Sequence, residues 1–108
     1  MKYDKLVRDK IPEIIEKDGK KAVTRMLSDE AYKIYLEKKL DEEVAEFHES
    51  KSLEELADIL EVVYALSHAY GHDPIEVFNE RCRKACERGK FAKRILLEEV
   101  HDEREEKA

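Results

Sequence analysis

Residues 37–50 (EKKLDEEVAEFHES) and residues 51–70 (KSLEELADILEVVYALSHAY) decide the fold of this chain. The first stretch continues an apolar stripe at helical spacing, and the second is apolar nearly all round from residue 59 to residue 66. That second pattern is typical of a central, buried helix. A turn between Ser50 and Lys51 separates the two stretches, so we expect a central antiparallel helix hairpin.

Four acids on this hairpin are the strongest chemical signal in the sequence. Glu43 and Glu46 lie three apart on the first helix, as do Glu55 and Asp58 on the second, so each pair shares a helix face. Folding the helices antiparallel about the turn brings Glu46 level with Glu55 and Glu43 level with Asp58. Carboxylates this close should repel or share a proton. A hard divalent cation such as Mg²⁺ would resolve the conflict.

Angular positions on the second helix separate these acids from ordinary surface charge. At about 100° per residue, Glu54, Glu61 and His68 share a polar strip, whereas Glu55 and Asp58 lie among apolar residues. Acids among apolar neighbours cost stability unless they are paired or metal-bound. This placement favours a metal site over the alternative, a solvated charged face.

Glu55 also has a competing structural role. Ser52 and Glu55 fit a capping box, in which the Glu side chain reaches back to the backbone of the Ser. A capping Glu55 would be less free to bind metal, and Glu54 or solvent would be the substitute cap. Glu55 could therefore be a metal ligand or a helix cap. If one of the four acids does not contact the metal, we expect it to be Glu55.

Local signals place further helices around the hairpin. We expect a short helix begun by Pro12 and ended by Gly19, and a long helix from the cap Ser28 to about Glu49. A further helix is expected to begin at Asp73 and Pro74 and to end at Gly89. Residues 20–27 read as a short strand or an extended link, and residues 91–100 as a last helix or a strand paired with residues 22–27. Residues 1–9 are expected to be extended.

Length and charge limit the classes of function. The chain has 108 residues, which suits one domain over residues 1–108, and 44% of them are charged. The formal net charge of −6 argues against binding to nucleic acid, since that affinity comes from neutralising phosphates. The negative charge is still compatible with a ligand that is a small polyanion carried with its own Mg²⁺.

The sequence also indicates a location. No apolar run approaches the roughly 20 residues that span a bilayer, and MKYDKLVRDK lacks the apolar core of a signal peptide. We therefore expect a cytoplasmic protein without a membrane partner. Cys82 and Cys86 lack a second pair for a zinc site, so we expect two reduced, part-buried thiols.

Other chemistry is less well supported. The only Glu-x-x-His, the pattern of di-iron bundles, is Glu98–His101, far from the four acids in sequence, and no calcium loop of the EF-hand type is present. Two basic clusters read either as solvated patches or as phosphate contacts. They comprise Lys5, Arg8 and Lys10 in the first, and Arg88, Lys90, Lys93 and Arg94 in the second.

Together, these motifs carry a family resemblance. EExxE at residues 42–46 followed by ExxD at residues 55–58 resembles the MazG-like all-α nucleoside triphosphate pyrophosphohydrolases. The segments YDKLVRDKIPEII, TRMLSDEAY and RGKFAKRILLEEV are similar to a small house-cleaning branch of that superfamily. The resemblance covers nearly the whole chain, and phosphoribosyl-ATP pyrophosphohydrolase is related in fold.

The resemblance implies an all-α, four-helix bundle-like fold with an extended N-terminal segment, assembled as a homodimer or homotetramer. The implied enzyme requires Mg²⁺, with Mn²⁺ as an alternative, and splits a nucleoside triphosphate into a nucleoside monophosphate and pyrophosphate. Glu43, Glu46, Glu55 and Asp58 correspond to the metal ligands, and Glu42 or Glu46 to the catalytic base. The expected phosphate contacts are Lys5, Arg8, Lys10, Arg88, Lys93 and Arg94.

Two other functions stay open. A non-catalytic helical binding or assembly module would keep the bundle and use the acids as a structural ion site or an exposed face. An enzyme acting on a phosphoribosyl nucleotide of histidine synthesis would keep the chemistry, but the chain offers no partner enzyme domain to favour it.

Overall fold

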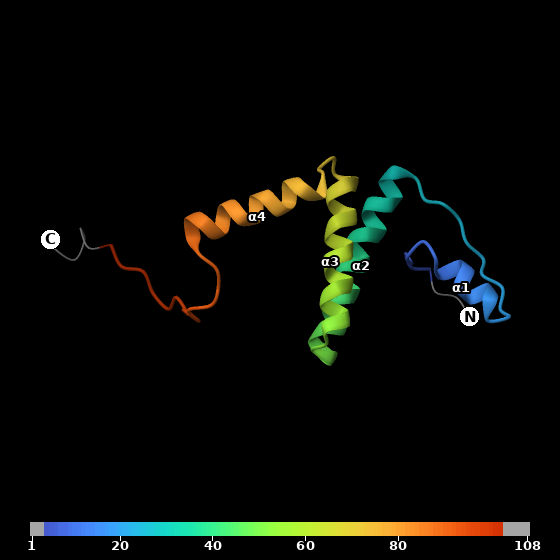
Figure 1. The fold of residues 1–108 in the computed structure, drawn as a ribbon, viewed down its shortest axis with the longest axis horizontal. Coiled ribbons are helices and arrows are strands. Elements are labelled where there is room, and N and C mark those ends of the chain that lie inside the picture. Colours follow the sequence, from blue (N-terminus) through green and yellow to red (C-terminus); the bar gives the residue numbers. More distant parts are fainter. Residues whose placement is uncertain (1–3, 103–108) are drawn as a thin grey trace. The chain divides into compact units, whose positions relative to one another are not determined.

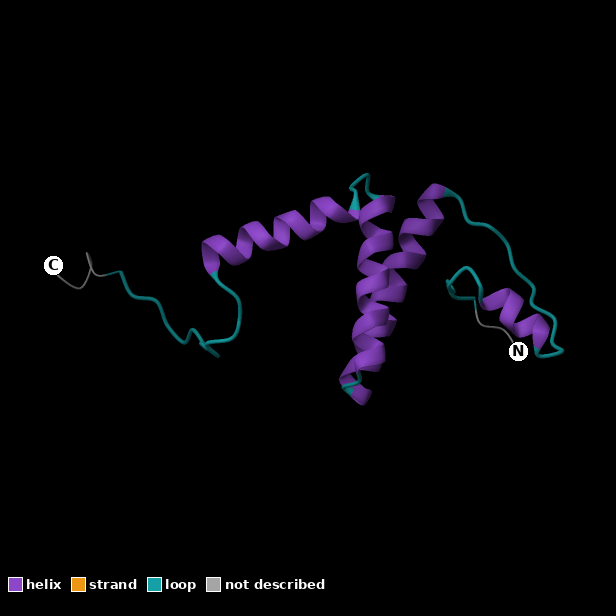
Figure 2. Cartoon of the chain, in the orientation of Figure 1, coloured by secondary structure: helices purple, strands orange, loops and turns teal. Residues whose placement is uncertain are grey.

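A computed structural model describes residues 4–102, and over this range all regular structure is helical. The helices are α1 (Ile11–Lys17), α2 (Asp29–Ser50), α3 (Leu53–Ala69) and α4 (Pro74–Arg88). Figure 2 shows the helices joined by irregular segments, with no strand among the described residues. The all-α prediction is therefore confirmed for this part of the chain. The chain divides into two compact units between Val77 and Phe78, and each is described by itself.

The hairpin of α2 and α3 dominates the first unit. The two helices lie side by side in Figure 1, joined by a connection of two residues, Lys51 and Ser52. Lys51 ends α2 in the left-handed conformation with φ 55°, and its N–H donates to the Phe47 carbonyl at 2.8 Å. Ser52 begins α3 by accepting a hydrogen bond from the Glu55 N–H at 3.3 Å. The predicted central hairpin is thus present, and local capping chemistry sets its tip.

Few side chains of this unit are buried. Leu36 on α2 and Val62 on α3 form the apolar core, at 2% and 7% exposure, and the polar residues buried with them are Glu43 and Ser67. The Ser67 hydroxyl is satisfied because it donates to the His72 carbonyl at 2.9 Å. As expected from its apolar sequence, α3 carries much of the burial of this unit, since residues 62–67 are all buried or partly buried. Its burial is not complete, because Leu60 is half exposed.

The chain before α2 is only lightly packed. Residues 4–10 have no regular structure, α1 comes next with Pro12 in its first turn, and Gly19 (φ 79°) lies just after its end. None of the residues of α1 is buried. Residues 20–28 are irregular, so an extended link describes them and a strand does not. Ser28 caps α2 as predicted, accepting from the Ala31 N–H at 3.2 Å.

The predicted caps also bound α4, but the segment after this helix differs from both expectations. Asp73 Oδ1 accepts the Ile75 N–H at 2.9 Å, and Gly89 (φ 82°) ends the helix. Residues 91–100 are neither helix nor strand. An isolated strand needs a pairing partner and a short helix needs a packed face, and the apolar side chains of this stretch are all exposed.

Two smaller observations complete the fold. Cys82 and Cys86 on α4 are free, and both are exposed, so the expected partial burial is wrong. Among the helices of residues 4–102, none has both the length and the apolar character that a membrane span requires.

Candidate metal centre

Glu43 is the buried centre of a group of acids on the hairpin. It lies on the same face of α2 as Leu36, two turns earlier, and that face packs on α3. The side chain is only 5% exposed. Its Oε1 forms a salt bridge with Lys39 Nζ at 3.1 Å, whereas its Oε2 is buried without a hydrogen-bond partner among the described residues. A buried, unsatisfied carboxylate oxygen is costly and calls for a ligand or a proton.

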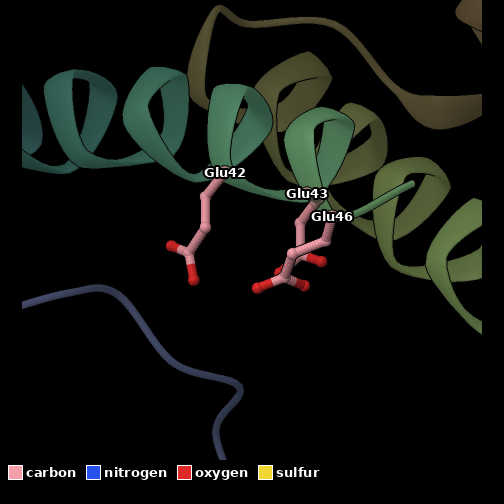
Figure 3. A group of neighbouring side chains, drawn as sticks. All are labelled: Glu42, Glu43 and Glu46. Atoms are coloured by element: carbon pink, nitrogen blue, oxygen red, sulfur yellow. The ribbon is translucent and has the colours of Figure 1, made fainter. Parts of the chain in front are cut away.

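Four other acids surround Glu43, and together the five form what we call the acid cluster: Glu42, Glu43, Glu46, Glu55 and Asp58. Oxygens of Glu43, Glu55 and Asp58 lie within 4.8 Å of one another, and so do oxygens of Glu42, Glu43 and Glu46. Figure 3 shows the three α2 acids projecting to the same side of the helix, with the carboxylates of Glu43 and Glu46 close together. The hairpin therefore brings the four predicted ligands together, and Glu42 joins them from α2.

The exposed strip on α3 matches the angular prediction. Glu54, Glu61 and His68 are all exposed, whereas Glu55 and Asp58 are partly buried. On α3, burial thus confirms the predicted distinction between the solvated acids and the two acids among apolar neighbours.

Within the acid cluster, Glu55 has a strongly raised pKa. Burial of its carboxyl group, together with the neighbouring carboxylates of Glu43 and Glu46, raises its pKa from 4.5 to about 7. Its Oε2 is buried without a hydrogen-bond partner among the described residues. The capping role is divided: Ser52 Oγ accepts the Glu55 N–H, but the Ser52 N–H donates to Ser50 Oγ at 3.2 Å. Ser50 therefore accepts the Ser52 N–H in place of the Glu55 side chain, Glu54 or solvent. The Glu55 side chain instead faces the other acids.

Three cations pair with the acid cluster. Lys5 Nζ lies 3.2 Å from Glu42 Oε1, and Arg8 Nη2 lies 2.7 Å from Asp58 Oδ1. The hydrogen bond to Glu42 raises the pKa of Lys5. Of the predicted phosphate contacts, Lys5 thus lies at Glu42, a predicted catalytic residue, and Arg8 lies at the predicted metal ligand Asp58.

Lys39 is the third cation and was not predicted from the sequence. It contacts Glu43 at 3.1 Å and Glu42 at 3.6 Å, and its side chain is largely buried. Its spacing of three and four residues from these acids is the signal that could have identified it.

The other predicted basic residues lie in other parts of the chain. Lys10 precedes α1 and is exposed. Arg88, Lys93 and Arg94 belong to the second unit, where Arg88 ends α4 and the Arg94 N–H donates to the Phe91 carbonyl. The acid cluster is built from the first unit alone.

The chemistry of the donors can be tested against a hard cation. Every potential ligand is a carboxylate oxygen, the donor that Mg²⁺ and Mn²⁺ prefer. Glu43 and Glu55 each have one buried carboxylate oxygen without a hydrogen-bond partner in the described part of the chain. These residues fit a divalent cation, which would satisfy both oxygens and offset the negative charge of the neighbouring carboxylates.

Comparisons with known proteins add little to this geometry. No protein-family model matches the chain, and no solved structure matches it. An uncharacterized protein of Mycolicibacterium smegmatis is 58% identical over 41 residues. That match covers 38% of this chain and 42% of the relative, so it spans less than half of either protein.

Proposed function

We propose that this protein is a MazG-like nucleoside triphosphate pyrophosphohydrolase that requires Mg²⁺ and forms a nucleoside monophosphate and pyrophosphate. The observation that carries the proposal is Glu43, a buried carboxylate with an unpartnered oxygen, at the centre of five acids. Basic side chains of residues 4–10 border the same acids. Acids that hold a metal next to cations that hold phosphate are the parts that hydrolysis of a phosphoanhydride needs.

Each acid has a role in this proposal. Glu43, Glu46, Glu55 and Asp58 would hold Mg²⁺, with Mn²⁺ as a substitute. The bound ion would neutralise phosphate charge and lower the pKa of a water molecule. Glu42 or Glu46 would accept a proton from the attacking water. Glu42 suits this role because it is partly exposed at the border of the acid cluster.

Lys5 and Arg8 would contact the triphosphate. Both side chains already lie at carboxylates, so they need to move only locally to reach a phosphate bound there. An Arg can make two parallel hydrogen bonds to a phosphate, and a Lys acts as a point charge. Lys10, Arg88, Lys93 and Arg94 remain proposed contacts from sequence alone.

Measuring pyrophosphate release from a panel of nucleoside triphosphates with Mg²⁺ tests the function. We expect Glu55→Gln and Asp58→Asn to lower turnover by more than about tenfold, since even residues behind a metal ligand matter by 10–100-fold. Glu54→Gln is the matched control, because it removes one charge from the exposed strip of the same helix. Wild-type turnover in both ligand variants would refute the site, and no turnover on any nucleotide would refute the enzyme.

A further inference from the structure

The Arg8–Asp58 ion pair ties an irregular part of the chain to the acid cluster. Arg8 Nη2 lies 2.7 Å from Asp58 Oδ1, and Lys5 forms the neighbouring pair with Glu42 at 3.2 Å. We call residues 4–10 the N-terminal segment. Within it only Leu6 is partly buried, and every other residue is exposed. Two ion pairs, together with the partly buried Leu6, therefore hold the N-terminal segment on the hairpin.

Asp58 is also part of the group that fits a cation. Its carboxylate lies within 4.8 Å of the oxygens of Glu43 and Glu55. Both neighbours have a buried oxygen without a hydrogen-bond partner among the described residues. A divalent cation held by these three residues would bind the Asp58 carboxylate that Arg8 contacts. The charge of the cation would also repel the Arg8 guanidinium.

The strengths of the two interactions favour exchange. The Arg8 side chain is 56% exposed, so water and salt screen its pair with Asp58. A cation in the acid cluster would instead be held by several carboxylates, of which Glu43 is almost completely buried. The weaker and more exposed partner should leave.

We propose that Arg8 and a divalent cation are alternative partners of Asp58, so that cation binding releases the N-terminal segment from the acid cluster. The proposal rests on the proposed function only in taking the acid cluster as the cation site. It assigns Arg8 two successive roles: neutralising Asp58 before the cation binds, and contacting phosphate afterwards. Metal loading and exposure of a phosphate-binding side chain then occur in one step.

Titration with Mn²⁺ alone tests the competition, with free Mn²⁺ measured by electron paramagnetic resonance. Arg8→Gln should bind Mn²⁺ about two- to fivefold more tightly than wild type, the range expected for losing one exposed competing ion pair. Arg25→Gln is the matched control because Arg25 is an exposed Arg of the same unit and lies in the link before α2, outside the acid cluster. Equal affinities of the two variants, or no Mn²⁺ binding by either, would overturn the proposal.

Limited digestion of the wild-type chain tests the release without any substitution. Trypsin can cleave after Arg8 in the N-terminal segment and after Arg25 in the exposed link before α2. Adding Mn²⁺ should raise the rate of cleavage after Arg8 at least twofold relative to cleavage after Arg25, which serves as an internal control. A constant or falling ratio at saturating Mn²⁺ would show that Arg8 is not displaced.

These measurements contain no nucleotide, so they are separable from the enzymatic proposal. Release of the N-terminal segment without pyrophosphate formation would support the exchange and refute the hydrolase. Pyrophosphate formation with an unchanged cleavage ratio would support the hydrolase and refute the exchange.

Discussion

At the scale of single residues, Glu55 determines how the acid cluster responds to protons. Its carboxyl group is shielded on one side and faces Glu43 and Glu46 on the other, which raises its pKa from 4.5 to about 7. The folded chain therefore holds a proton on Glu55 over a pH range in which the unfolded chain has already lost it.

This difference in proton binding sets the sign of the effect on stability. Because the folded state binds more protons than the unfolded state between about pH 4.5 and 7, the free energy of unfolding falls as pH rises through this window. We expect urea denaturation of the metal-free chain to show this loss of stability. Glu55→Gln should make the slope shallower over the same window.

Glu54→Gln should keep the wild-type slope, because Glu54 lies on the exposed strip of the same helix. A Glu55→Gln variant with an unchanged slope would show that Glu55 ionises normally in the folded chain. Addition of Mg²⁺ should also reduce the slope, because a metal-bound carboxylate is deprotonated throughout.

At the scale of helices, the α2–α3 hairpin depends on a small apolar contact. Leu36 is 2% exposed against α3, whereas Ile34 on the same helix is 52% exposed. We expect Leu36→Ala to lower the free energy of unfolding by about 2–4 kcal/mol, the range for truncating a buried Leu. Urea denaturation with circular dichroism measures the change.

Ile34→Ala is the control, and it should cost less than about 1 kcal/mol because less apolar area is lost. Equal losses in the two variants would show that the contact around Leu36 does not hold the hairpin together.

The helices also show why some features could be predicted from the sequence and others could not. Ser28, Ser52, Asp73 and Gly19 act on backbone groups a few residues away, so their positions fix helix ends locally. The acids of the hairpin could be predicted to lie close together because helical spacing and one short turn fix their relative positions.

Residues 91–100 could not be predicted in this way. Their apolar pattern fits a helix or a strand equally, and either would need a partner surface that a sequence pattern does not specify. The partner of Ser52 was missed for a different reason. A hydroxyl two residues away, on Ser50, replaced the carboxylate that the capping pattern predicts.

At the scale of the whole molecule, apolar side chains are exposed in both units. Leu53 and Leu60 are exposed in the first unit, and Phe78, Phe91 and Leu96 in the second. Contiguous exposed apolar patches are characteristic of surfaces that become covered on assembly. These side chains are the reason to test the homodimer or homotetramer that the family resemblance implies.

Sedimentation velocity tests this assembly. We expect the wild-type chain to sediment with at least twice the mass of one chain. Phe78→Ser should shift the distribution toward a single chain because it removes a half-exposed aromatic side chain from α4. Asn79→Ser, at the neighbouring exposed position, should leave the distribution unchanged. A wild-type chain that sediments as a monomer at micromolar concentration would refute the proposed assembly.

The two-residue connection between α2 and α3 has a consequence for how this chain can vary in length. A residue inserted between Glu43 and Asp58 would either extend a helix, which turns the residues after it by about 100°, or lengthen the capped two-residue connection that sets where α3 begins. Either change would carry Asp58 away from Glu43. The link before α2 carries no such restriction, because the entropy cost of a longer loop grows slowly. Chains that keep this group of acids should therefore tolerate insertions between α1 and α2, while the interval from Glu43 to Asp58 stays constant.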